Sequence, residues 1–227
     1  MKKKNICLIP ARGGSKRIKN KNIKLFNNHP LISYAIKASK KSKIFDRVIV
    51  STDSKKIAKI SIKYGAEIPF LRSKNISTDK STTLSVIKDV IKRLKLYERY
   101  EFICVIYATA VRVSDKDLYN AQKKIKRDKS DMLISVTEFD YPPLRALKIN
   151  NKNFLEFNWK QYAPKRSQDL PKLIRDAGQF YIYRISSISK IKNVIPKKTS
   201  FFMLRRYNAI DIDTPEDLEL LKKIYSK

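Results

Sequence analysis

The stretch KKKNICLIPARGGSKRIKNKNI, residues 2–23, decides the fold of this chain. An apolar run, Asn5 to Ile9, is followed at once by Pro10, a glycine pair and a series of cations. The run predicts a buried strand, and the glycines, which lack a Cβ, predict a loop whose backbone comes close to a ligand. The loop matches neither GxxxxGKS/T nor GxGxxG. We therefore expect a strand that ends in a phosphate-binding loop of another type.

Outward from this stretch, short apolar runs alternate with helical patterns. The apolar runs are NICLIP, RVIVST, EFICVIY and DMLISVTE, and the helical patterns are PLISYAIKASKKS, SKKIAKISIKYG, SVIKDVIKRLKLY and SDKDLYNAQKKIKR. This alternation is typical of βαβ units around a mostly parallel sheet that is buried on both faces. Ligands of such sheets bind at the carboxyl ends of the strands. The segments to examine are therefore 10–15, 51–54, 107–109 and 211–214.

The alternation fails between residues 139 and 176, where aromatics, prolines and asparagines are frequent. We expect an insertion there that leaves the sheet and serves as a lid or an oligomer contact. A strand at QFYIYRI resumes the fold, and near the end of the chain Thr214 and Pro215 predict the N-cap and first position of a last helix. The prediction is one domain, residues 1–227, with an insertion at 139–176.

Composition excludes several classes of function. The net charge of +30 is spread from Lys2 to Lys227 and is not gathered with aromatics in one stripe, so we expect no dedicated nucleic-acid partner. The N-terminal apolar run is broken by Pro10 before it reaches the roughly 7 residues of a signal peptide core, and no run approaches the roughly 18 of a membrane span, so we expect a cytoplasmic protein without a membrane partner. Cys7 and Cys104 are expected as buried apolar side chains. His29 is the only histidine, and it lies outside the segments expected to meet a ligand, so we expect no Ser-His-Asp triad.

Asp211 and Asp213 are two apart on a segment expected to be the end of a strand, where the period of two places both carboxylates on one face. Such a pair is costly unless it shares a cation or a proton, and Mg²⁺ is the natural partner when phosphates are near. Alternatively, one aspartate supports the following helix and the other is solvated. The loop cations can equally belong to the general lysine excess. Taken together, the glycine loop and the carboxylates indicate metal-assisted nucleotidyl or phosphoryl transfer.

Longer motifs carry a resemblance to a known family. IPARGGSKRIKNKNI, VIVSTDSKKIAKISIKYGAEIPFLR and AIDIDTPEDL resemble the acylneuraminate cytidylyltransferases, which activate nine-carbon keto sugars as CMP conjugates. SVTEFDYPPLRALKIN and RSQDLPKLIRDAGQFY resemble more narrowly the branch that makes CMP-pseudaminate. The resemblance implies a Rossmann-like, GT-A-like α/β nucleotidyltransferase fold of three layers. It further implies CTP and an acidic nine-carbon keto sugar as substrates, Mg²⁺ as cofactor, and a homodimer whose inserted segment reaches toward the partner's site.

The resemblance also assigns residues. It places Arg12, Gly13, Gly14, Ser15, Lys21 and Asn22 at the CTP phosphates, Arg72 and Thr83 at the cytidine, Asp211 and Asp213 at the metal, and Tyr107, Arg166, Gln168, Asp176, Gln179 and Phe180 at the sugar. Arg12, Lys21 and the two aspartates are the expected catalytic set. The aromatics Tyr141, Phe180 and Tyr181 either offer apolar surface to the sugar or pack in the core.

The chain departs from the family pattern at three positions. Ala108 and Val111 stand where the branch carries prolines, and Arg175 stands where a histidine is expected. Activation of sialate, legionaminate or the eight-carbon Kdo is therefore the closest alternative. A basic RNA-binding protein that keeps a nucleotide-binding fold is a more distant alternative.

Overall fold

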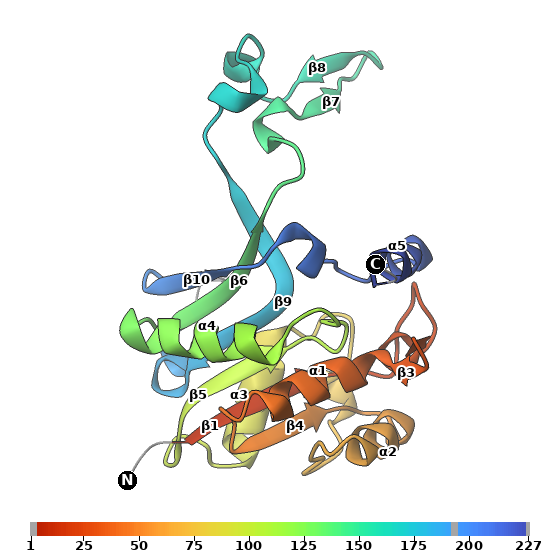
Figure 1. The fold of residues 1–227 in the computed structure, drawn as a ribbon, viewed down its shortest axis with the longest axis vertical. Coiled ribbons are helices and arrows are strands. Elements are labelled where there is room, and N and C mark those ends of the chain that lie inside the picture. Colours follow the sequence, from red (N-terminus) through yellow and green to blue (C-terminus); the bar gives the residue numbers. More distant parts are fainter. Residues whose placement is uncertain (1–3, 192–194, 226–227) are drawn as a thin grey trace.

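The computed structural model describes residues 4–191 and 195–225, which form a six-stranded sheet flanked by helices (Figure 1). The sheet contains β1 (Lys4–Pro10), β4 (Arg47–Ser51), β5 (Tyr100–Ile106), β6 (Met132–Glu138), β9 (Ile174–Arg184) and β10 (Thr199–Met203), in the order β10-β6-β9-β5-β1-β4. Only β9 runs against its neighbours, and the other pairs are parallel. The prediction of a mostly parallel α/β fold is confirmed.

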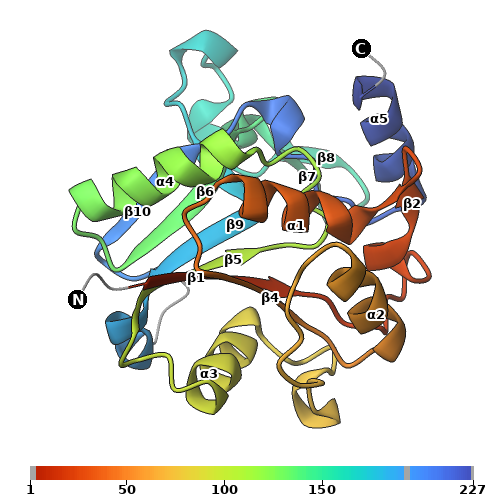
Figure 2. The same ribbon diagram turned by 60° about the horizontal axis from the view of Figure 1, so that its bottom comes forward.

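Helices cover both faces of the sheet and make the three predicted layers. One face packs against α1 (Leu31–Lys41), α2 (Lys55–Lys63) and α4 (Asp115–Arg127), and the other against α3 (Thr83–Arg93). Figure 2 shows α1 and α4 on one side of the strands and α3 on the opposite side. Along β1, Cys7 and Ile9 face the first group of helices, whereas Ile6 and Leu8 face α3. This two-sided burial explains why the strands read as continuous apolar runs.

Both cysteines are fully buried, as expected. The Cys7 sulfur lies 3.2 Å from the Ser39 hydroxyl, and burial raises the pKa of the Cys7 thiol to about 12. Both thiols therefore stay protonated near neutral pH and act as small core side chains.

Two parts of the fold differ from the expectations. Strand β10 was not predicted: it lies at the sheet edge, parallel to β6, and its Phe201 and Met203 remain exposed. The expected strand end at Asp211 and Asp213 is wrong, because the chain runs without strand pairing from the turn η7 (Arg206–Asn208) to α5 (Pro215–Tyr225). The segment instead packs against the glycine loop and the last helix, where Ile212 is buried with Ile18 and Leu218.

The last helix starts as predicted. The Thr214 hydroxyl accepts the backbone N–H of Asp217 at 3.3 Å, which is an N-cap bond. Leu218 and Leu221 of α5 pack with Ile18 of the glycine loop and with Ile212 between the aspartates. The helix thereby holds the aspartate segment beside the loop that follows β1.

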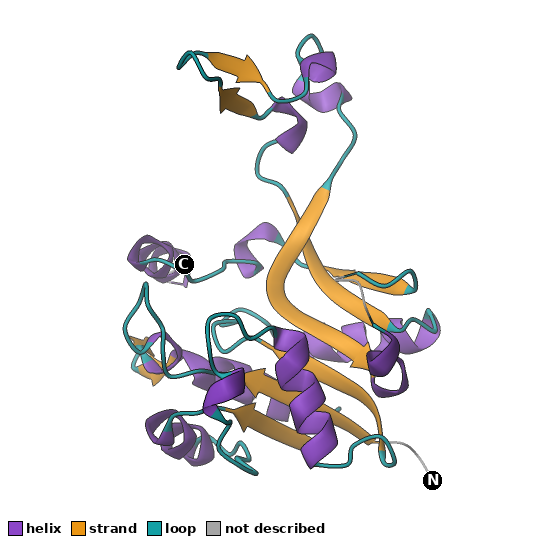
Figure 3. Cartoon of the chain, turned by 180° about the vertical axis from the view of Figure 1, so that it is seen from behind, coloured by secondary structure: helices purple, strands orange, loops and turns teal. Residues whose placement is uncertain are grey.

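The insertion leaves the sheet after Glu138 and returns at Ile174, so regular pairing resumes slightly before the expected boundary at 176. We call residues 139–173 the arm. It contains the hairpin β7 (Leu147–Ile149) and β8 (Leu155–Phe157) and the short turns η3 (Pro143–Arg145), η4 (Lys160–Tyr162) and η5 (Ser167–Asp169). Figure 3 shows the arm standing apart from the three layers.

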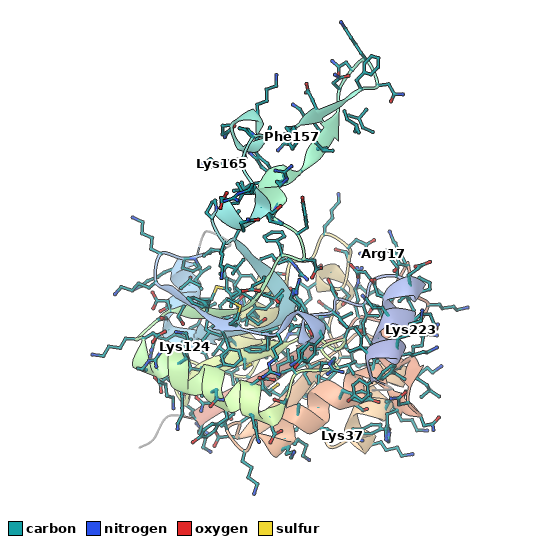
Figure 4. All side chains as sticks on the ribbon, turned by 45° about the horizontal axis from the view of Figure 1, so that its top comes forward. Arg17, Lys37, Lys124, Phe157, Lys165 and Lys223 are labelled. Atoms are coloured by element: carbon teal, nitrogen blue, oxygen red, sulfur yellow. The ribbon has the colours of Figure 1, made fainter. Side chains whose placement is uncertain are left out.

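The arm exposes several large hydrophobic side chains. Its exposed large hydrophobic side chains include Tyr141, Leu147, Ile149, Phe154 and Leu155. Figure 4 shows Phe157 and Lys165 on the arm, well apart from Arg17 beside α5.

The remaining elements are short. They are η1 (Lys21–Ile23), the small hairpin β2 (Leu25–Phe26) and β3 (His29–Pro30), η2 (Lys74–Ile76) and η6 (Ile185–Lys190). Within residues 4–191 and 195–225, no helix combines the length and the apolar character that crossing a membrane requires.

Candidate active site

A cavity of about 550 Å³ opens at the carboxyl ends of β1 and β5. Four segments line it: the loop after β1 (Arg12, Ser15, Lys16, Arg17, Lys21, Asn22), the stretch into α3 (Arg72, Asp79, Ser81, Thr83), the turn after β5 (Tyr107, Ala108, Thr109) and the segment before α5 (Asp211, Asp213). This is the edge of the sheet at which the sequence predicted a ligand. The parallel strands bring together residues that are up to about 200 positions apart in the chain.

The glycine pair shapes the loop. The Gly13 N–H donates to the Asp53 carboxylate at 2.8 Å, and a Cβ at Gly13 would lie 3.1 Å from the Ser54 Cβ, so a larger residue would push this loop away from the turn after β4. A Cβ at Gly14 would meet nothing within 4 Å. The buried Asn22 amide donates to the Arg12 carbonyl at 2.9 Å and closes the loop from behind.

The loop cations are engaged with an acidic residue that the sequence analysis did not assign. Arg12 and Lys16 both form ion pairs with Asp79, the latter at 2.5 Å. These hydrogen bonds, that of Lys16 first and then that of Arg12, hold the pKa of Asp79 below its usual value. The Asp79 carboxylate therefore sits where an anionic ligand would meet the same two cations. The sequence feature that could have indicated Asp79 is its position as the single acidic residue in the serine- and threonine-rich run STDKSTT.

Arg72 is the most deeply buried cation of the cavity, with a relative exposure of 6%. Its Nε donates to the Ser77 hydroxyl at 3.1 Å, and among the described residues no carboxylate lies within ion-pair distance. Burial lowers the pKa of its guanidinium. A buried, unpaired guanidinium is costly unless a ligand supplies acceptors, so Arg72 marks a place for one.

Asp211 and Asp213 meet in the cavity although they are not on a strand. Lys21 donates to the Ile212 carbonyl at 2.7 Å and to the Asp213 carboxylate at 2.9 Å, and Arg17 pairs with Asp213 at 3.0 Å. The Asp211 carboxylate has no hydrogen bond to any described residue. Desolvation first, and then the charge of Asp213, raise the pKa of Asp211. The site thus holds one neutralised carboxylate and one that lacks a partner.

Asp217 supports this segment from the start of α5. It accepts the N–H groups of Asp213 at 2.9 Å and Thr214 at 2.7 Å and the Thr214 hydroxyl at 3.0 Å. Burial acts to raise the pKa of Asp217, but these hydrogen bonds together outweigh it and hold the pKa below its usual value. Asp217 therefore stabilises the N-terminus of α5. This is the role that was the alternative for Asp211 or Asp213.

The carboxylate pair fits a divalent cation only together with ligand oxygens. Within the part of the chain that the structure describes, no group of three or more metal-ligating side chains occurs. Asp211 and Asp213 supply two carboxylates, and Mg²⁺ commonly completes its coordination with water and substrate phosphates. The unpartnered carboxylate of Asp211 is the observation that favours a cation at this point.

The residues assigned to the sugar lie in different parts of the structure: at the cavity, in the buried interior, and on or beside the arm. Tyr107 lines the cavity, and its hydroxyl lies 3.3 Å from the Thr83 hydroxyl. Gln179 is buried and donates to the Ala177 and Ile210 carbonyls, so its amide holds the backbone near Asp211. Phe180 does not line the cavity: its ring is fully buried in the core, beside Phe202.

The other three residues assigned to the sugar lie on the arm or at its foot, and they do not line the cavity of the same chain. Arg166 and Gln168 are exposed and do not line the cavity, and Arg166 forms an ion pair with Asp169 at 2.8 Å. Asp176, at the start of β9, lies at the foot of the arm. Arg175 donates to the Asp176 backbone carbonyl at 3.2 Å and makes no hydrogen bond to the Asp176 carboxylate.

The turn after β5 remains closed despite its missing prolines. Ala108 and Val111 are buried, and the turn is held by hydrogen bonds from Ala110 N–H to the Tyr107 carbonyl at 3.0 Å and from Val111 N–H to the Thr109 carbonyl at 2.8 Å. Packing and backbone bonds here provide the order that proline would otherwise contribute.

Comparisons with known proteins identify the family of this chain. The family model described as Cytidylyltransferase matches residues 6–227. Pseudaminic acid cytidylyltransferase from Campylobacter jejuni subsp. jejuni serotype O:2 is 40% identical over 98% of this chain and 96% of its own length. CMP-N,N'-diacetyllegionaminic acid synthase of the same organism is 29% identical over 97% of this chain and 94% of its own length. CMP:2-keto-3-deoxy-manno-octonic acid synthetase complexed with CTP shares the fold, with a TM-score of 0.72, 14% identity and 98% coverage of each chain.

Proposed function

Because the chain belongs to the cytidylyltransferase family, we propose that it transfers the CMP group of CTP to a nine-carbon acidic keto sugar, and that this sugar is pseudaminic acid. The single observation that carries the nucleotide assignment is the cavity itself. It combines the buried, unpaired Arg72 with the loop cations Arg12, Lys16 and Lys21.

Different cations are proposed to bind the triphosphate and the cytidine of CTP. Arg12 and Lys16 lie at the glycine loop, where charge-assisted hydrogen bonds to a triphosphate replace those to Asp79. Arg72 is proposed to donate to the cytidine, since a cytosine ring presents carbonyl and ring-nitrogen acceptors. Thr83, held near the Tyr107 hydroxyl, offers a further hydroxyl on the same wall.

The proposed reaction is an in-line displacement. The anomeric hydroxyl oxygen of the sugar forms a bond to the α-phosphorus of CTP, the bond from that phosphorus to the bridging oxygen of the β-phosphate breaks, and pyrophosphate leaves. The hydroxyl proton needs an acceptor. No histidine lines the cavity, and Asp211, whose carboxylate has no hydrogen bond to any described residue, is the proposed one.

Asp211 and Asp213 are also proposed to hold Mg²⁺ when nucleotide is bound, and the ion would then neutralise charge on the phosphates and on the leaving pyrophosphate. Lys21 contributes to this arrangement by fixing the Ile212 carbonyl and the Asp213 carboxylate. The Asp213 carboxylate and the backbone between the two aspartates are thereby oriented before any ligand arrives, which is the condition for electrostatic preorganisation.

The arm is proposed to complete the site of a second copy in a homodimer. Its exposed Leu147, Ile149, Phe154 and Leu155 form an apolar surface that water does not favour, which indicates an interface. Arg166 carries a guanidinium suited to the sugar carboxylate but does not line the cavity of its own chain. An arm that crosses to a partner subunit would bury these apolar side chains, and it would bring Arg166 to the cavity of the partner.

The acceptor is tested by pyrophosphate release from CTP and Mg²⁺ with pseudaminate, legionaminate, sialate and Kdo at equal concentrations. We expect pseudaminate to react fastest and sialate to be slower by about a hundredfold or more, because an apolar pocket rejects added hydroxyls only to about that extent. Preference for sialate or legionaminate would overturn the choice of sugar. Lack of release with every acid sugar would overturn the cytidylyl transfer.

A further inference from the structure

We propose that Tyr181 is a positioning residue that fixes the Asp176 carboxylate in the turn beside Asp211, next to the cavity, so that Asp176 accepts hydrogen bonds from hydroxyl or acylamino N–H groups of the sugar. The proposal rests on the proposed function and adds to it a residue that holds the carboxylate in place. It is carried by the contacts of three residues on β9.

Both oxygens of the Asp176 carboxylate are held. The Tyr181 hydroxyl donates to Oδ2 at 2.7 Å, and the Gly178 N–H donates to Oδ1 at 2.8 Å. Asp176 is nevertheless exposed. An exposed aspartate normally samples several rotamers, whereas two donors on separate oxygens restrict both of its side-chain torsions. The remaining lone pairs of the carboxylate therefore point in fixed directions.

Tyr181 is suited to this task because it stays protonated and is itself held. Burial first, and then the neighbouring Tyr107 and Asp176, raise the pKa of its hydroxyl, so it remains a donor throughout the physiological range. Its ring packs edge-on against Tyr107 at a centroid distance of 5.7 Å. Tyr107 in turn lines the cavity and lies beside Thr83. The row Thr83, Tyr107, Tyr181 and Asp176 thus runs from the nucleotide wall to the foot of the arm.

An irregularity in the sheet brings Asp176 and Tyr181 together. Ile134 pairs with Tyr181 and Val136 with Asp176, so β9 carries extra residues between these two pairs. Gly178, inside this bulge, has φ of 61°, a conformation that favours glycine. A Cβ at Gly178 would lie 3.7 Å from the Asp211 Oδ2. The bulge therefore sets the Asp176 turn directly against the carboxylates of the reaction site, as bulges near active sites often do.

The chemistry of the ligand follows from the charge of Asp176. A carboxylate repels the acidic group of the sugar and the phosphates, and it accepts from O–H and N–H donors. Asp176 is therefore expected to read the hydroxyl or acylamino side of the acceptor, and the sugar carboxylate must be bound by a cation elsewhere.

The test is the change Tyr181→Phe, which removes one hydroxyl and keeps the ring. We expect KM for pseudaminate to rise about tenfold, the usual loss for one hydrogen bond to a charged group, with KM for CTP unchanged. Tyr183→Phe is the matched control: Tyr183 lies two residues further on the same strand, is buried in the same cluster, and has no hydrogen bond from its hydroxyl among the described residues. It should leave both KM values unchanged.

The double variant separates positioning from a direct role. In an Asp176→Asn background, which should itself raise KM for the sugar, Tyr181→Phe should cause little further change if it acts through Asp176. An unchanged KM for the sugar in Tyr181→Phe, equal rises of both KM values, or full additivity with Asp176→Asn would each overturn the proposal. The unaltered enzyme is measured first on the sugar panel. Its inactivity with every sugar would overturn the proposed function and, with it, this inference.

Discussion

The change Asp211→Asn should separate catalysis from stability, because the two effects have opposite signs. Asp211 has no hydrogen bond to any described residue, and desolvation and Asp213 raise its pKa. Asparagine keeps the shape of the side chain and removes the charge. We expect turnover to fall by about a hundredfold to a thousandfold, since stabilisation of transferring charge is worth several kcal/mol at such a site.

The fold should not lose stability in the same variant. A carboxyl group whose pKa is raised in the folded state binds more protons there than in the unfolded chain, so its ionisation lowers the free energy of unfolding as the pH rises above the usual aspartate value. Removing the charge should therefore increase that free energy near neutral pH. The gain should be small, from a few tenths to about 1 kcal/mol, because the group is open to solvent on the cavity side. The difference should vanish below about pH 3, where Asp211 is protonated in both states.

The assay is denaturant unfolding near neutral pH and at low pH, combined with pyrophosphate release on the same preparations. Asp217→Asn is the comparison, because Asp217 accepts hydrogen bonds from Asp213 and Thr214. It should lower the free energy of unfolding by about 1 kcal/mol, as the loss of a helix cap does. An Asp211→Asn protein that is less stable at neutral pH yet turns over CTP like the parent would refute the assignment of Asp211 to the reaction.

Three further changes test the other parts of the site. Arg12→Ala should raise KM for CTP severely and leave the fold intact. The control is Arg99→Ala, because Arg99 is an exposed arginine outside the cavity, and this change should not raise KM. Equal effects of the two changes would show that only the general charge of the protein matters. Asp79→Asn should lower KM for CTP several-fold at low salt, because the nucleotide no longer competes for Arg12 and Lys16, and the gain should shrink as salt screens these exposed pairs; a higher KM would mean that Asp79 instead holds the cations in place. Replacing the exposed Ile149 and Leu155 of the arm with serine should convert a dimer to monomers in sedimentation and reduce turnover; a parent protein that is already monomeric would contradict the proposed interface.

Local patterns were enough to predict most of the framework. The apolar runs around Cys7, Val48, Cys104 and Leu133 became buried strands, and the period of the helical patterns between them placed α1 to α4 correctly. A strand that is buried on both faces must be apolar at nearly every position, so its sequence is distinctive whatever it pairs with. The insertion could be predicted because its sequence lacks such a pattern: aromatics and prolines without periodicity do not form a crossover helix.

Long-range pairing was decided only by the tertiary structure. Arg12 meets Asp79 across 67 positions, and Lys21 meets Asp213 across 192, and no local period encodes either contact. Phe180 and Tyr181 are adjacent aromatics with the same sequence signal, yet one is in the core and the other holds Asp176, because successive residues of a strand face opposite sides. The segment with Asp211 and Asp213 has the composition of a strand, but its buried Ile212 packs against Ile18 of the glycine loop and Leu218 of α5, and the segment forms no ladder with the sheet. Periodicity depends on which side of an element is buried, whereas pairing depends on which elements arrive at the same edge, and only the folded chain determines that.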